Sequence, residues 1–110
     1  MTPPLEMNCA AVKSWIDSGE SFLFLDCREP DEHRVSRIEG TLLIPMSEIT
    51  QRISELEAYR QNPIVVHCHH GGRSLRVTNW LRTQGFPLAV NMSGGIDEWS
   101  QQIDPSIPRY

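Results

Sequence analysis

Cys68 is the residue of this sequence best placed to do chemistry, because it stands between an apolar stretch and a glycine-containing loop that leads into a helix pattern. Residues 64–67 are typical of a strand, and the loop after the thiol consists of His69, His70, Gly71, Gly72, Arg73 and Ser74. A loop that joins a strand to a helix N-terminus directs backbone N–H groups at one point, and the helix dipole adds partial positive charge there. Both effects favour thiolate over thiol. The segment therefore predicts a reactive cysteine in an anion-binding loop.

The loop residues also predict how the thiolate is stabilised. Gly71 and Gly72 can take positive φ values, which lets the backbone curl beneath the sulfur without a Cβ clash, and Arg73 can add a fixed positive charge. Lowering the pKa of a thiol from about 8.5 to about 7 raises its thiolate fraction near neutral pH from a few per cent to about half. Cys9 and Cys27 belong to no CxxC pair and are interpreted as structural.

Composition limits the classes of protein to which the chain can belong. Its 110 residues, 39% apolar and 22% charged, indicate one globular domain over residues 1–110 rather than a disordered or fibrous chain. The net charge of -4 argues against nucleic acid as a partner. No apolar run is long enough to span a membrane, and residues 1–4 lack the features of a secretory signal. A free catalytic thiol suits a reducing compartment, so we expect the protein in the cytoplasm.

The apolar pattern predicts alternating strands and helices. Strands are expected over residues 22–25, 42–44, 64–67 and 87–90. Helices are expected over residues 9–17 with Asn8 as cap and Gly19 as stop, from residue 30, from Ser74 to Gly85 and after residues 93–95, with helical turns capped by Ser47 reaching Tyr59. Continuous apolar runs are typical of strands covered on both faces, so the fold class is α/β with a mainly parallel sheet.

Asp26 and Arg28 follow the first of these strands, on the side of the sheet where active sites of such folds gather. They are therefore candidates for lining the pocket. An architectural role is the alternative, in which Asp26 accepts backbone N–H bonds and Arg28 pairs with Glu29 or Glu32.

The histidines beside Cys68 raise the question of a metal site. His67 is interpreted as structural, whereas His69 and His70 are expected to shape the rim of the pocket. Adjacent residues in a tight loop rarely point at one ion, and no second cluster has the spacing of zinc ligands, so no metal is expected. Residues 94–95 are interpreted as a tight turn that places Trp99 in the core.

Four segments resemble, in order, the landmarks of the single-domain rhodanese family: residues 25–32, residues 38–45, the loop 68–74 and residues 93–99. The resemblance covers nearly the whole chain. It implies a parallel sheet of about five strands flanked by helices on both faces, with the active-site loop at the carboxyl edge of the sheet. Ser36-Arg37 and Thr41 depart from the Gly-His and Ala that many relatives carry.

The resemblance implies sulfur transfer in two steps. The Cys68 thiolate attacks the outer sulfur of a small anionic donor such as thiosulfate, sulfite leaves, and a thiol or dithiol acceptor, which can be a protein, takes the sulfur from the Cys68 persulfide. Arg73 would bind the sulfonate end of the donor, unless it braces the loop by pairing with an acid. No organic cofactor is implied.

Two other functions stay open. Phosphatases and arsenate reductases of related fold use a cysteine and an arginine in a similar loop, but that loop has one residue more than the four between Cys68 and Arg73. The shorter loop favours a single sulfur atom over a tetrahedral phosphoryl group. A non-catalytic interaction module is the other alternative, and the presence of Cys68 argues against it because inactive relatives often lose this residue.

Overall fold

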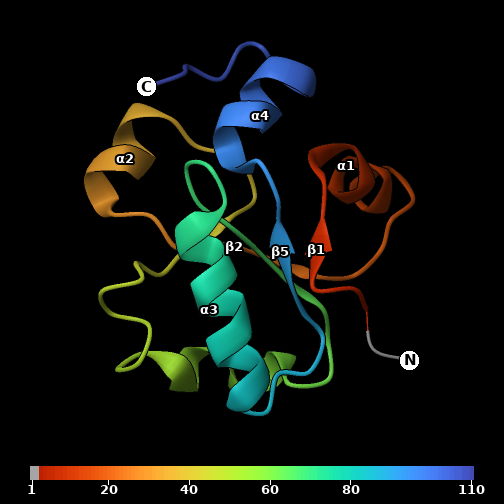
Figure 1. Ribbon diagram of the computed structural model, residues 1–110, viewed down its shortest axis with the longest axis vertical. Helices are drawn as coiled ribbons and strands as arrows, with labels where there is room; N and C mark the ends of the chain where they lie inside the picture. Colours follow the sequence, from red (N-terminus) through yellow and green to blue (C-terminus); the bar gives the residue numbers. More distant parts are fainter. Residues whose placement is uncertain (1–2) are drawn as a thin grey trace.

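The computed structural model describes residues 3–110, in which helices cover both faces of one sheet (Figure 1). Met1 and Thr2, where the sequence predicts no secretory signal, lie outside the described residues. The strands are β1 (Glu6–Met7), β2 (Leu23–Asp26), β3 (Leu42–Leu43), β4 (Ile64–His67) and β5 (Ala89–Met92). All pair in parallel, in the order β1-β5-β4-β2-β3. The prediction of an α/β fold with a parallel sheet of about five strands is confirmed.

Within residues 3–110, four α-helices and one 3-10 helix pack around the sheet. They are α1 (Cys9–Asp17), α2 (Pro30–Val35), the 3-10 helix η1 (Ile53–Tyr59), α3 (Gly72–Thr83) and α4 (Gly95–Gln102). Among the helices of residues 3–110, none has both the length and the apolar character needed to cross a membrane.

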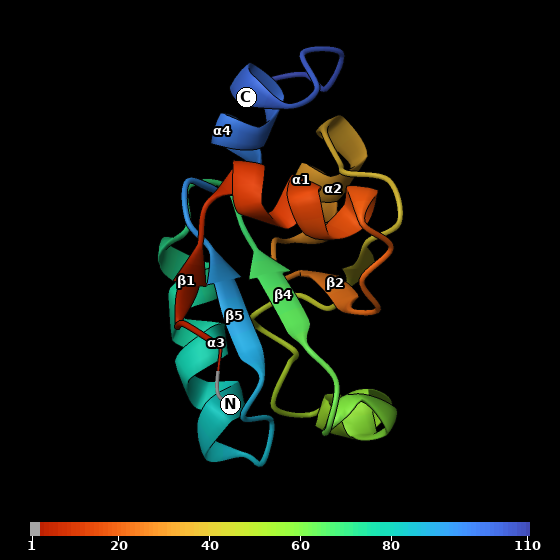
Figure 2. The same ribbon diagram turned by 90° about the vertical axis from the view of Figure 1, so that its right-hand side faces the viewer.

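The sheet separates two apolar cores, because successive residues of a strand point to opposite faces. Leu25 and Val66 contribute to the core shared with α3 and η1, whereas Phe24 and Val65 contribute to the core shared with α1 and α4 (Figure 2). Each fully buried side chain of this kind contributes about 1.5–3 kcal/mol. Every residue of β4 and β5 is buried, which explains why these strands show no alternation of polar and apolar residues.

The local signals at α1 are confirmed. The Asn8 side chain accepts a hydrogen bond from the N–H of Ala11 (2.9 Å), which satisfies one of the free donors at the helix N-terminus. Gly19, with φ 76°, follows the C-terminus and reverses the chain.

Other boundaries differ from the prediction. The last strand is Ala89–Met92 rather than 87–90, because it pairs with β4 through residues 89–91. The two-residue β1 was not predicted, since only its pairing with β5 makes it a strand. Ser47 caps no helix; its hydroxyl donates to the Glu29 carboxylate (3.1 Å), and the turns before Tyr59 are a 3-10 helix that begins at Ile53.

The strand order decides which segments surround Cys68. Cys68 follows β4, and β4 lies between β2 and β5 in the sheet. Because all strands run in parallel, the segments that leave β2 and β5 flank the Cys68 loop at the same edge of the sheet.

Candidate active site

Cys68 lies in the loop between β4 and α3, and only 1% of its surface is exposed. Its Sγ accepts hydrogen bonds from the N–H groups of Gly71 (3.1 Å) and Ser74 (3.4 Å). The Ser74 hydroxyl lies 3.3 Å from the same sulfur. The first turn of α3 thus directs several donors at one thiol.

Burial and hydrogen bonding act on the pKa of Cys68 in opposite directions. Burial has the largest influence and would raise the pKa, but hydrogen bonds from the Ser74 hydroxyl and from the N–H groups of Ser74, Gly71 and His70 together hold it below its ordinary value. Burial raises the pKa of Cys9 to about 11 and raises that of Cys27 further. Of the three cysteines, all within residues 3–110, Cys68 is the one whose environment favours thiolate.

Gly71 provides the left-handed residue at which the loop turns into α3. Its φ is 109°, and a Cβ added there would lie 3.3 Å from the backbone nitrogen of Gly94. Gly72 has no positive φ and is the first residue of α3, so Gly71 alone uses the conformational freedom that glycine allows at both positions. One left-handed residue is enough to turn the chain, and the next can already be helical.

The N-terminus of α4 holds the Cys68 loop from behind. The N–H of Ile96 donates to the Cys68 carbonyl (2.9 Å), and the N–H of Asp97 donates to the His69 carbonyl (3.1 Å). These bonds orient the carbonyls toward α4 and satisfy free donors of its first turn. Gly95, with φ 60°, makes this approach feasible, because a Cβ there would lie 2.5 Å from the Cys68 carbonyl oxygen. From the sequence, this glycine was expected only to form a tight turn.

Replacing Gly95 with alanine should therefore disturb both stability and thiol reactivity. We expect the free energy of unfolding to fall by about 2–4 kcal/mol, because the left-handed φ is strained and the added Cβ meets backbone atoms. Urea denaturation and the rate of Cys68 alkylation measure the two effects. Gly40→Ala is the matched control, since Gly40 has φ 85° but no atom within 4 Å of an added Cβ. Equal losses in both variants would contradict the role of the close approach.

Arg73 pairs with Glu32 of α2. Its Nη1 and Nη2 donate to the two carboxylate oxygens at 2.7 and 2.8 Å, and the Tyr110 hydroxyl donates to the same carboxylate (2.7 Å). The hydrogen bonds from Arg73 lower the pKa of Glu32 to about 2. The alternative in which Arg73 pairs with an acid is thus realised, while 31% of the arginine side chain stays exposed to solvent.

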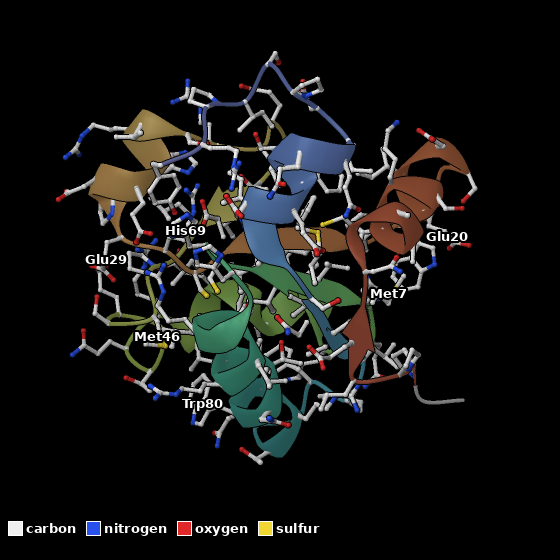
Figure 3. All side chains as sticks on the ribbon, turned by 45° about the horizontal axis from the view of Figure 1, so that its top comes forward. Met7, Glu20, Glu29, Met46, His69 and Trp80 are labelled. Atoms are coloured by element: carbon white, nitrogen blue, oxygen red, sulfur yellow. The ribbon has the colours of Figure 1, made fainter. Side chains whose placement is uncertain are left out.

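His69 lies at the rim of the loop, in the region between α2 and α4 (Figure 3), and the side chain of the adjacent His70 is exposed. The His69 ring stacks on the Tyr110 ring, with 3.9 Å between the two ring centroids. The Nδ1 atom of His70 lies 3.9 Å from the Asp97 carboxylate. Tyr110 was missed by sequence reasoning, because an aromatic residue near the end of the sequence carries no motif.

His67 points into the core on the α1 side of the sheet, where its ring meets that of Phe24 (5.4 Å between centroids). Burial lowers the pKa of His67 to about 4, so its imidazole is neutral near pH 7. Within residues 3–110, no three His, Cys, Asp or Glu side chains are arranged to hold a metal ion.

Asp26 and Arg28 form a fully buried ion pair. Nη2 and Nε of Arg28 donate to the Asp26 carboxylate at 2.7 and 2.9 Å, and Arg28 also donates to the Ser36 carbonyl (2.7 Å) and the Tyr110 hydroxyl (3.1 Å). Neither side chain is exposed, so the structure favours the architectural alternative over pocket lining, and Asp26 also accepts a hydrogen bond from the Arg28 backbone N–H (3.0 Å). A buried arginine needs a carboxylate and further acceptors, and Asp26 supplies the carboxylate in place of Glu29 or Glu32.

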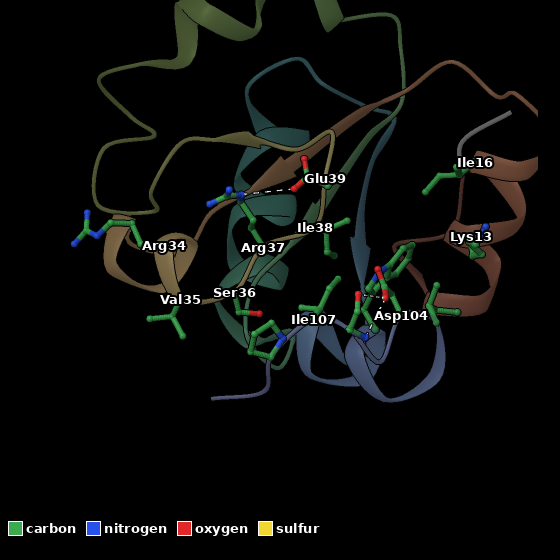
Figure 4. Close-up of a pocket in the computed structure, with 14 residues that line it drawn as sticks. Lys13, Ile16, Arg34, Val35, Ser36, Arg37, Ile38, Glu39, Asp104 and Ile107 are labelled. Atoms are coloured by element: carbon green, nitrogen blue, oxygen red, sulfur yellow. Dashed lines mark hydrogen bonds and ion pairs between the residues drawn. The ribbon is translucent and has the colours of Figure 1, made fainter.

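A groove of about 610 Å³ lies elsewhere, between α1, α4 and the segment after α2 (Figure 4). Residues 34–39 and 103–108 contribute most of its lining, together with Lys13, Ile16 and Trp99. No residue of the loop 68–74 lines it. The groove is therefore separate from the cysteine site.

Proteins of similar sequence include rhodanese-like proteins and sulfurtransferases. The chain is 37% identical over 89 residues to the Rhodanese-like/PpiC domain-containing protein 12, chloroplastic, of Arabidopsis thaliana; the match covers 78% of this chain and 29% of that protein. It is 32% identical over 109 residues to the Adenylyltransferase and sulfurtransferase MOCS3-2 of Zea mays, covering 94% of this chain and 23% of that protein. The chain thus spans less than a third of the length of these two relatives.

Solved structures share the fold. The rhodanese-related protein from Thermoplasma volcanium superposes with a TM-score of 0.81 at 29% identity, covering 97% of this chain and all of that one (100%). The family described as Rhodanese-like domain matches residues 8–102, which include the Cys68 loop and the α4 N-terminus behind it. This chain belongs to the rhodanese-like domain family.

Proposed function

We propose that this protein is a sulfurtransferase, which moves a sulfane sulfur from thiosulfate or a related small anionic donor to a thiol or dithiol acceptor through a persulfide on Cys68. The proposal rests on one observation: Gly71 and Ser74 donate hydrogen bonds to Cys68 Sγ, and these bonds lower the pKa of the thiol. The word sulfurtransferase in the name of the Zea mays relative supports it. The free thiols suit a reducing compartment such as the cytoplasm.

The first step loads the enzyme. The Cys68 thiolate donates an electron pair to the outer sulfur of thiosulfate, the S–S bond of the donor breaks, and its electron pair leaves with sulfite. The backbone N–H groups of Gly71 and Ser74 already point at the reacting sulfur, so they stabilise negative charge without rearrangement.

The second step transfers the sulfur from Cys68 to the acceptor. An acceptor thiolate attacks the terminal sulfur of the persulfide, the bond between this sulfur and Cys68 breaks, and Cys68 leaves as a thiolate. The hydrogen bonds that lower the pKa of Cys68 make it a better leaving group in this step.

Intact-mass measurement tests the proposal. The reduced protein is incubated with thiosulfate, separated from excess donor and measured by intact-mass spectrometry. We expect a mass gain of one sulfur atom that disappears when a thiol is added. A folded protein that gains no sulfur from thiosulfate or from an organic persulfide would overturn the proposal. Activity on a phosphate ester or on arsenate would then favour the related phosphatase or arsenate reductase chemistry.

Replacing Arg73 with alanine should raise the KM for thiosulfate by about tenfold, or roughly 1.4 kcal/mol, because a positive charge that can meet the sulfonate is lost. The change also leaves the carboxylate of Glu32 without its main partner, and this carboxylate would repel an anion. The double variant Arg73→Ala/Glu32→Gln separates the two effects in steady-state assays. A KM near the wild-type value in the double variant would mean that Arg73 serves only to neutralise Glu32.

A further inference from the structure

Asn91 of β5 lies behind Ser74 and is fully buried. Its Nδ2 donates to the Glu6 carboxylate (2.8 Å) and to the Gly71 carbonyl (3.3 Å). A backbone carbonyl can only accept, so these contacts fix the amide with its nitrogen toward Gly71 and its oxygen toward Ser74. Asn91 Oδ1 accordingly accepts a hydrogen bond from the Ser74 hydroxyl.

The Ser74 hydroxyl has one proton but two acceptors within reach, Asn91 Oδ1 and Cys68 Sγ. When Cys68 is a thiol, its S–H can donate to Ser74 Oγ while the Ser74 proton stays with Asn91, and every donor has a partner. When Cys68 is a thiolate, the hydroxyl stabilises it only by turning its proton to the sulfur. Asn91 Oδ1 then has lost its donor in a buried position, which is unfavourable.

We propose that Asn91 is a positioning residue that competes with Cys68 for the proton of the Ser74 hydroxyl and thereby sets the balance between loading and unloading of sulfur. The inference rests on the proposed function, because it concerns the two steps of that reaction. Cys68 is the attacking group in the first step and the leaving group in the second. A more stabilised thiolate leaves faster but attacks more slowly, so a full hydrogen bond from Ser74 would favour unloading at the expense of loading.

The charged and titratable groups around the loop come from every neighbouring element. They are Glu6 on β1, Cys27 after β2, Glu32 on α2, His67, His69 and His70 beside Cys68, Arg73 on α3 and Asp97 on α4. Burial keeps Cys27 neutral near pH 7, and Arg73 stays paired with Glu32. These two groups therefore keep the same charge while Cys68 titrates.

The test measures the pH dependence of Cys68 alkylation by iodoacetamide, followed on the Cys68 peptide by mass spectrometry. We expect Asn91→Leu, which removes the competing acceptor, to lower the apparent pKa of Cys68 by about one unit, and Ser74→Ala to raise it by a similar amount. Ser74→Ala/Asn91→Leu should match Ser74→Ala alone, because Asn91 has nothing to withhold once the hydroxyl is gone. Additive effects in the double variant would overturn the inference.

Thr78→Val is the matched control. The Thr78 hydroxyl is buried in the same helix and donates to the Ser74 carbonyl (2.8 Å), and it forms no hydrogen bond with Cys68 Sγ or Asn91. Its removal should leave the Cys68 titration unchanged, and a shift equal to that of Asn91→Leu would mean that any polar loss near α3 has this effect. If Asn91→Leu does not fold, Asn91→Ala carries the same expectation without added bulk. An unchanged or raised pKa in the folded variant refutes the proposed competition.

Single-turnover kinetics distinguish this inference from the function on which it rests. At a pH where Cys68 is fully ionised in both proteins, Asn91→Leu should load from thiosulfate about threefold more slowly and transfer sulfur to a dithiol about threefold faster than wild type, following the partial sensitivity of thiol exchange to pKa. Absence of loading in the wild type refutes the proposed function. The alkylation profiles still decide whether Asn91 competes for the Ser74 proton.

Discussion

Replacing Cys68 with serine should abolish sulfur loading from thiosulfate. A serine hydroxyl is not ionised near neutral pH, and the loop donors that stabilise a thiolate cannot make it a comparable nucleophile. We expect no gain of one sulfur in the intact mass and a fall of at least about a thousandfold in transfer to cyanide or to a dithiol. The fold should be retained, because serine is close to cysteine in size and faces several donors at this position.

Cys27→Ser and Cys9→Ser are the controls for this experiment. Burial raises the pKa of both thiols, so neither is expected to form a persulfide from thiosulfate near pH 7. Cys27 is the stricter control, since it packs in the same apolar core as Cys68. A folded Cys27→Ser protein that no longer loads sulfur would contradict the assignment of Cys68 as the only nucleophile.

Replacing Arg28 with methionine should give the largest loss of stability. Methionine removes the guanidinium that pairs with Asp26 inside the protein, and the remaining carboxylate is left buried without its counter-ion. We expect the free energy of unfolding to fall by about 3–5 kcal/mol, the usual cost of breaking a buried ion pair from one side. Urea denaturation at pH 7 measures this loss.

The control removes both charges. Asp26→Asn/Arg28→Met should be more stable than Arg28→Met, because no uncompensated charge remains inside the protein. A single variant as stable as the double one would mean that the Asp26 carboxylate takes up a proton or reaches water at no cost.

The same pair predicts a pH dependence of stability. Burial, the largest influence, would raise the pKa of Asp26, but hydrogen bonds from Arg28 and the charge of nearby groups lower it below the ordinary value. As the pH falls below about 4, the unfolded chain takes up a proton at this carboxyl before the folded protein does, so stability present at neutral pH is lost progressively. The decline should be shallower in Asp26→Asn/Arg28→Met when unfolding is measured between pH 5 and 2.5, on the order of one proton less per unfolding event.

Local features were the most predictable part of this protein. The cap at Asn8, the apolar runs of β2 and β4 and the turn at Gly71 follow from the chemistry of a few neighbouring residues. One expected cap and one unpredicted strand depend on contacts with residues that are distant in the sequence. The role of Ser47 as a cap gave way to a hydrogen bond with Glu29, and β1 exists because β5 lies beside it.

Asn91 and Gly95 are two residues whose roles at the site the sequence could have indicated only in part. Asn91 is a polar residue in a strand that is otherwise buried and apolar, which indicates that its amide has a specific partner. Gly95 precedes a helix in a second strand-to-helix loop, and its need for glycine becomes evident only when the Cys68 loop is seen against it. In both cases the residue type indicates a specific structural role, but the sequence does not indicate which residue is its partner.

The sequence by itself determined the loop that lowers the pKa of Cys68, because the donors to Cys68 Sγ lie within six residues of it and follow from a strand, a glycine turn and a helix start. Only the tertiary structure decided what surrounds this loop: the pairing of Arg73 with Glu32, 41 residues away, and the contact of Ser74 with Asn91, 17 residues away. Such partners depend on the order of strands in the sheet and on how α2 and β5 pack beside β4, and these arrangements arise from the burial of two apolar cores rather than from local backbone preferences.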